Sequence, residues 1–127
     1  MIARVLTGIV GVAHLYFGYR EIWDWKNFAG KILKIEPNSP FFIHTTSLAA
    51  NQGLYNLFLG IGLLMAIANL FGNGSRNVSF FILICIIVAG IVGWITMNTT
   101  IFLLAQSAAA LVALIACWFL WNADGSS

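Results

Sequence analysis

The chain has 127 residues, of which 61% are hydrophobic and only 8% are charged, and its mean hydropathy is +0.93. Soluble domains average about half apolar and a quarter charged residues, so this composition indicates a small membrane protein with one domain. The net charge of +2 is small and dispersed, which argues against a nucleic-acid partner.

Four apolar stretches are long enough to cross a bilayer as helices, which takes about 20 residues each. They cover residues 2–23, 46–71, 77–97 and 100–121. The last two connections are short, so neighbouring helices must run antiparallel. The predicted fold is all-α: an integral membrane four-helix bundle, up-down-up-down, forming a single domain over residues 1–123 with a polar tail at 124–127.

The long connection, residues 24–45, contains a second kind of helical pattern. Its apolar residues share one helical face: Trp25, Phe28, Ile32 and Ile35. Lys31 and Lys34 lie mostly off that face, which predicts a short interfacial helix between the first two spans, ended by Pro37 and Pro40. A mobile loop with incidental periodicity is the alternative.

The distribution of positive charge predicts the orientation in the membrane. The side of the first loop carries four basic residues: Arg20, Lys26, Lys31 and Lys34. The opposite side carries only Arg4 and Arg76. The positive-inside rule therefore predicts a multi-pass protein of the cell inner or plasma membrane with the 24–45 loop in the cytoplasm.

Polar residues inside the spans gather in one half of the membrane. At about 1.5 Å per residue from the first-loop side, six of them lie at most about 14 Å deep: His14, Glu21, Asn51, Gln52, Asn56 and Gln106. Polar groups at that depth have lost their water and need partners inside the protein, so we expect a shared pocket. Tyr16 and Tyr55 complete the predicted ligand-binding set.

His14 and Glu21 are the predicted catalytic pair. They are seven residues apart, or two helical turns, and so share a face. Histidine readily exchanges a proton near neutral pH, so His14 would act as acid or base, assisted by Glu21. Amides nearby would orient an oxygen of a lipophilic molecule during isomerisation, ring opening or hydrolysis.

Two other functions remain open at this stage. A proton-linked or small-molecule transporter would use His14 and Glu21 as a relay, and would need to assemble as a homo-oligomer because four spans are few. A structural membrane subunit would use the buried amides only as interhelical contacts, each worth about 0.6 kcal/mol. Small residues on the fourth span, Ala105, Ala109 and Ala113, predict ordinary close helix packing.

Several chemistries lack their sequence signals. There is no glycine-rich phosphate loop, nucleophile elbow, Cys-x-x-Cys or His-Glu-x-x-His. Two histidines and four carboxylates are few for a zinc site, and haem would have His14 as its one plausible ligand, so we predict no metal and no cofactor. Cys85 and Cys117 lie in apolar runs and are expected to be small buried hydrophobes. The expected partners are the lipid bilayer and a lipophilic small molecule.

Three segments together resemble one known family. They are HLYFGYREIWDW from residue 14, LAANQGLYNLFLGIGLL from residue 48, and VAGIVGWITMNTTIFLLAQSAAALVAL from residue 88. They are similar to the small membrane proteins grouped as domain of unknown function 1304. The resemblance rests on these positions: His14, Tyr16, Glu21, Trp25, 49–56, 90–93 and Gln106. Ala13 stands where relatives often carry an acidic residue, and a proline that tends to follow the glutamine is absent. The resemblance implies fold and membrane location but no reaction.

Overall fold

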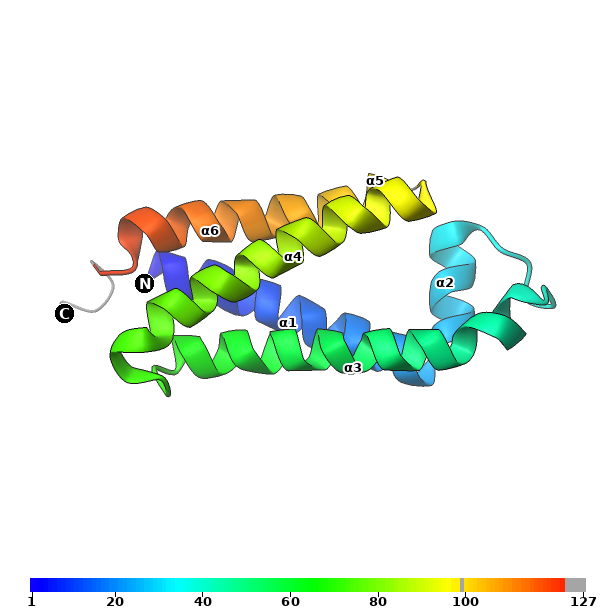
Figure 1. Ribbon diagram of the computed structural model, residues 1–127, viewed down its shortest axis with the longest axis horizontal. Helices are drawn as coiled ribbons and strands as arrows, with labels where there is room; N and C mark the ends of the chain where they lie inside the picture. The colour runs from blue at the N-terminus through cyan, green and yellow to red at the C-terminus, as the bar shows by residue number, and fades with distance from the viewer. Residues whose placement is uncertain (99, 123–127) are drawn as a thin grey trace.

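Four long helices make up the computed structural model, which describes residues 1–98 and 100–122 (Figure 1). The helical segments are, in chain order, α1 (Ile2–Trp23), α2 (Trp25–Leu33), α3 (Phe41–Ile67), η1 (Gly72–Gly74), α4 (Ser75–Met97), α5 (Thr100–Phe102), η2 (Leu103–Ala108) and α6 (Ala109–Leu120). Here η1 is a 3-10 turn and η2 a π-helical turn. The predicted all-α bundle is confirmed. The predicted tail at 124–127 lies outside the described residues.

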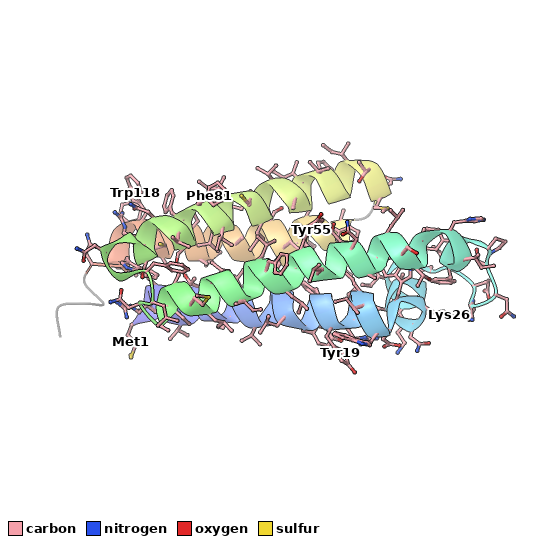
Figure 2. All side chains as sticks on the ribbon, turned by 60° about the horizontal axis from the view of Figure 1, so that its bottom comes forward. Met1, Tyr19, Lys26, Tyr55, Phe81 and Trp118 are labelled. Atoms are coloured by element: carbon pink, nitrogen blue, oxygen red, sulfur yellow. The ribbon has the colours of Figure 1, made fainter. Side chains whose placement is uncertain are left out.

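Four stretches are long and apolar enough to cross a membrane: Ile2–Trp23, Phe41–Ile67, Gly72–Met97 and Thr100–Leu120. Large apolar side chains cover the outside of the bundle, as Figure 2 shows for Phe81 and Trp118, which are 68% and 58% exposed. A soluble protein rarely exposes so much contiguous apolar surface. The composition and this surface together indicate a multi-pass membrane protein.

The boundaries of the second span differ from those predicted. Helix α3 begins at Phe41, directly after Pro40, because proline is compatible with the start of a helix and needs no amide hydrogen there. It ends at Ile67, since Asn69 (φ 60°) and Gly72 (φ 54°) then adopt left-handed backbone conformations that turn the chain. The span is therefore shifted toward the long connection.

Helix α2 confirms that the long connection contains a short helix. It crosses the end of the bundle, between α3 and the start of α5 (Figure 1). Trp25 Nε1 donates a hydrogen bond to Thr45 Oγ1 at 2.9 Å, which ties the start of α2 to α3. The helix ends at Leu33, because Lys34 adopts a left-handed backbone conformation (φ 55°) three residues before Pro37. Its position at the membrane interface remains a prediction.

Glycines bring α1 and α3 into backbone contact. A Cβ atom on Gly18 would lie 2.7 Å from the carbonyl oxygen of Gly53, and a Cβ on Gly60 would lie 2.7 Å from that of Gly11. Both distances are shorter than real Cβ contacts, so only glycine permits this approach. The glycines of the two contacts are seven residues, or two helical turns, apart on each helix. These two contacts make α1 and α3 the most closely packed pair of helices in the bundle.

The main hydrophobic core lies toward the end of the bundle opposite α2 (Figure 1). Buried apolar residues from all four spans form the core there, Leu63, Leu83 and Ala113 among them. Helix α4 then diverges from α3 toward the α2 end, so that α2 lies between the two halves of the bundle (Figure 1). Of the predicted alanine ridge, Ala113 is buried, while Ala105 and Ala109 are exposed.

Candidate functional site

A hydrogen bond between two buried side chains joins α1 to α3. The Asn56 amide Nδ2 donates to Glu21 Oε2 at 2.6 Å. Asn56 is 2% exposed and Glu21 is 8% exposed. A carboxyl group in such surroundings requires a polar partner, because burial removes its water. Glu21 and Asn56 are two of the six polar residues for which a shared pocket was predicted.

The glycine contact explains how the pair forms. Glu21 and Asn56 each follow a contact glycine, Gly18 or Gly53, by three residues. In antiparallel helices this places their backbones about 9 Å apart along the axis, from six residues at about 1.5 Å. Side chains lean toward the N-terminus of their own helix, so these two lean toward each other and close that gap.

A small cavity lies beside the carboxyl group of Glu21. Its volume is about 90 Å³, and its lining includes Phe17, Glu21, Phe28, Ile32, Phe102 and Gln106. They come from α1, α2, α5 and the π-helical turn η2. A water molecule occupies about 30 Å³ in the liquid, so the space matches a few waters or the polar end of a small molecule. The cavity is thus mostly apolar with two polar groups at its wall.

Gln106 reaches this cavity from an irregular part of the fourth span. It lies in η2, where the helix widens into a π-turn, a feature found frequently at functional sites. Next to it, Ser107 Oγ donates to the backbone oxygen of Ile87 on α4 at 2.8 Å. Gly90 makes room for this contact, because a Cβ there would overlap the Ser107 side chain. The turn is therefore held in place by α4.

His14 is buried but does not line the cavity. Its Nδ1 lies 2.9 Å from the backbone oxygen of Val10, so Nδ1 carries the proton and donates it within α1. The ring meets Phe17 edge-on, with centroids 5.7 Å apart, and Phe17 in turn lines the cavity. The phenyl ring thus contacts both His14 and the space beside Glu21.

Four of the predicted ligand-binding residues lie on the surface. Asn51, Gln52 and Tyr55 on α3 are exposed, because the face of α3 that packs on α1 is the one with Gly53, Asn56 and Gly60.

Gln52 and Tyr55 therefore lie off the face that contacts α1. Figure 2 shows Tyr55 on α3. Tyr16, also exposed, accepts a hydrogen bond from Arg20 at its hydroxyl (2.6 Å). The structure brings Glu21, Asn56 and Gln106 together, and keeps these four outside the group.

The individual residues that form the aromatic wall of the cavity were not predicted. Phe28 and Ile32 were predicted to lie on the apolar face of a short interfacial helix, and in the structure they line the cavity. That stripe was the available signal, since an apolar face on a short helix must cover something. No sequence pattern marked Phe102 or the π-turn.

The chemistry available at the cavity is that of one carboxyl and one amide. Glu21 keeps one carboxyl oxygen beyond the Asn56 contact, and can accept a hydrogen bond or exchange a proton. Gln106 can both donate and accept. Within the described residues, no three His, Cys, Asp or Glu side chains group closely enough to hold a metal ion, and Cys85 and Cys117 are free thiols.

Comparison with known proteins gives one match. A family model described as "Protein of unknown function (DUF1304)" matches residues 8–118 of the 127. This region includes Glu21, Asn56 and Gln106. No curated protein and no solved structure matches the chain significantly.

Proposed function

The chain belongs to the DUF1304 family, and we propose that it is a membrane protein that binds a small lipophilic molecule through one polar group. The polar group enters the cavity beside Glu21, and the apolar remainder lies along the aromatic wall. Glu21 and Gln106 hold the polar group, which is a hydroxyl, amine or carbonyl. Asn56 fixes the Glu21 carboxyl in position.

One observation carries this proposal: the buried carboxyl of Glu21 and the side chain of Gln106 line the same small, mostly apolar cavity. An ionisable group inside an apolar span is costly, and such groups mark functional sites by default. A carboxyl that served only to bind Asn56 would need no open space beside it. A pocket with apolar walls and a few convergent polar groups is the usual form of a small-molecule site.

The same geometry supports acid or base catalysis by Glu21 rather than by His14. Glu21 borders the space where a reacting group would lie, whereas His14 already donates from Nδ1 to Val10 and is separated from the cavity by Phe17. Glu21 would take or return a proton during isomerisation, ring opening or hydrolysis. His14 then supports the position of Phe17.

Filling the cavity tests the proposal. Ala105 lines the cavity, and Ala105→Leu would place a larger side chain in it. Ala109→Leu is the matched control, because Ala109 is exposed one turn later in the span and lines no part of the cavity. Each protein is purified in mild detergent, extracted with organic solvent, and the extract is compared by mass spectrometry.

We expect one lipophilic species with a polar group to accompany the wild type and Ala109→Leu, and to be strongly depleted from Ala105→Leu. Circular dichroism of all three proteins checks that they remain helical. If no species differs between Ala105→Leu and Ala109→Leu, the cavity is not a binding site.

A further inference from the structure

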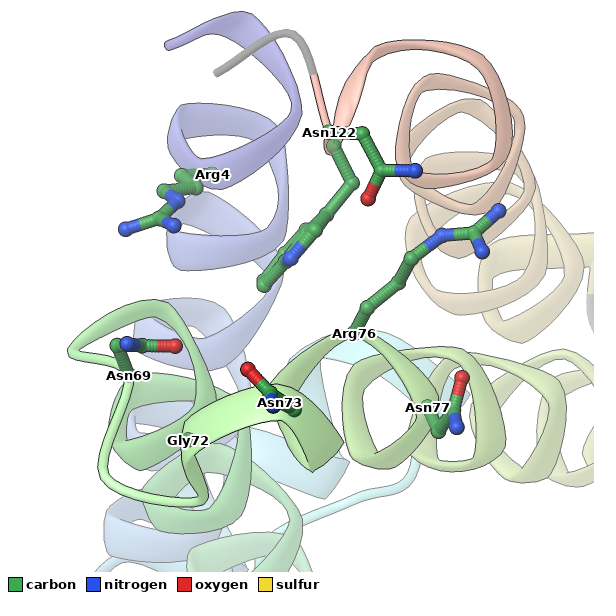
Figure 3. Close-up of a pocket in the computed structure, with 8 residues that line it drawn as sticks. Arg4, Asn69, Gly72, Asn73, Arg76, Asn77 and Asn122 are labelled. Atoms are coloured by element: carbon green, nitrogen blue, oxygen red, sulfur yellow. The ribbon is translucent and has the colours of Figure 1, made fainter. Parts of the chain in front are cut away.

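A second and larger cavity opens at the opposite end of the bundle, where α1 begins, α3 ends, α4 begins and α6 ends. Its volume is about 380 Å³, within the usual range for ligand sites. Six residues matter for its chemistry: Arg4, Asn69, Asn73, Arg76, Asn77 and Trp121. Figure 3 shows Arg4 and Arg76 on opposite sides of this cavity, with Asn69 and Asn73 between them. The proposed lipophilic site near Glu21 does not include any of them.

The described residues that line this cavity include two cationic side chains. Arg4 and Arg76 contribute two guanidinium groups, and among the described residues that line the cavity none is acidic. The asparagines add amide donors. Such a set suits an anion with several oxygen atoms, because guanidinium groups bind phosphate oxygens through paired hydrogen bonds.

Arg76 is held in place by the end of the fourth span. Its Nη2 donates to the backbone oxygen of Trp118 at 3.1 Å and its Nε to that of Cys117 at 3.5 Å. Its guanidinium also stacks on the Trp118 ring, 5.4 Å from the ring centre. These contacts use two of the five N–H groups of the guanidinium. The others remain as donors on a side chain whose position is already fixed, which lowers the entropy cost of binding.

Arg4 is positioned in a similar way on the other side. Its guanidinium lies 5.3 Å from the centre of the Trp121 ring, and its Nη1 donates to the backbone oxygen of Ile67 at 3.4 Å. Both arginines thus stack on a tryptophan near the end of the fourth span. The two charges flank the cavity instead of extending freely into solvent.

Helix α4 adds a third source of positive potential. It begins at Ser75 without a side-chain cap, and Arg76 and Asn77 in its first turn line the cavity. The amide groups of a helix N-terminus and the helix dipole both favour a bound anion. This contribution reinforces the two arginines at the same place.

The depth of the cavity in the membrane also fits a phosphate. All four spans begin or end here, at Ile2–Trp23, Phe41–Ile67, Gly72–Met97 and Thr100–Leu120. The ends of spans lie at the level of the lipid headgroups, where tryptophan is enriched. Trp118 and Trp121 mark that level, and lipid phosphates occupy it.

We propose that this cavity binds a phosphate group, carried either by an anionic lipid headgroup or by a soluble phosphate compound. The proposal is independent of the function proposed for Glu21. The two arginines and the start of α4 supply the binding energy, and the asparagines orient the oxygens.

A charge introduced into the cavity provides a test that spares the fold. Asn77→Asp places a carboxylate in the first turn of α4, where acidic residues stabilise helices, so the variant should fold. Asn38→Asp is the matched control, because it makes the same charge change at an exposed position beside the other end of the bundle. Arg76→Gln is the second variant.

Each protein is reconstituted in vesicles of equal parts phosphatidylcholine and phosphatidylglycerol, and retained lipid is counted by native mass spectrometry. In a second arm, inorganic phosphate is titrated into the protein in lipid-free micelles and heat is recorded.

Preferential retention of phosphatidylglycerol, reduced about tenfold by Asn77→Asp and Arg76→Gln but not by Asn38→Asp, supports the proposal with a lipid as source. Binding of inorganic phosphate with the same pattern, without lipid retention, supports a soluble source. Equal behaviour of wild type and Asn77→Asp in both arms overturns the proposal.

Discussion

Replacing Gly18 with alanine tests the backbone contact that positions Glu21 and Asn56. The added Cβ would lie 2.7 Å from the carbonyl oxygen of Gly53, whereas ordinary contacts begin at 3.4 Å, so α1 and α3 must separate by about 3.4 − 2.7 = 0.7 Å. Such overpacking costs about 1–3 kcal/mol. Alanine recovers about 1 kcal/mol of helix propensity, which leaves a net loss of about 0–2 kcal/mol.

Gly8→Ala in the same helix is the matched control. Its Cβ would meet only the flexible tip of Ile67, at 3.0 Å, so the propensity gain is retained at little steric cost. The free energy of unfolding, measured by chemical denaturation in detergent micelles, should therefore be about 1–3 kcal/mol lower for Gly18→Ala than for Gly8→Ala. Equal stability of the two variants would refute the close packing of α1 on α3.

Three further substitutions probe the remaining contacts. Asn56→Leu leaves the buried Glu21 carboxyl without its partner and should lower the free energy of unfolding by about 1–3 kcal/mol. The double variant Asn56→Leu/Glu21→Leu should lose less stability than the sum of the two single variants, because both remove the same hydrogen bond. Strictly additive losses would argue against this hydrogen bond. Trp25→Phe removes the donor to Thr45, so trypsin should cleave within α2 faster than in wild type, and unchanged cleavage would show that this hydrogen bond does not hold α2. In Gly90→Ala the added Cβ would meet Ser107 and separate the π-turn η2 from α4, so backbone amide hydrogen exchange should become faster in residues 103–108. Unaltered exchange would contradict the contact between Gly90 and Ser107.

Composition and periodicity were sufficient to predict the helices. Four apolar stretches, a short helix after Trp23 and antiparallel connections all follow from rules that act over neighbouring residues. The boundaries of α3 were less predictable, because they depend on Pro40 starting a helix and on Asn69 turning left-handed. Tertiary packing determines both of these backbone conformations.

The site could be predicted only in part. Counting depth along each span places Glu21 and Asn56 in one half of the membrane, but depth does not fix rotation about the helix axis. The Gly18–Gly53 contact sets that rotation, and it turns Asn56 inward and Gln52 outward. The π-turn at Gln106 has no sequence signal in a single chain, since it arises from packing against α4.

The most direct test of the proposed site is the binding of the co-purifying lipophilic molecule to Glu21→Gln, compared with Glu36→Gln. The second variant makes the same chemical change at an exposed loop position. A hydrogen bond to a charged group is worth about 1.5–3 kcal/mol, so the affinity of Glu21→Gln for the molecule should be about ten- to a hundredfold lower than that of wild type. Glu36→Gln should retain the wild-type amount. Equal retention by both variants would contradict the assignment of Glu21 as the group that binds the ligand.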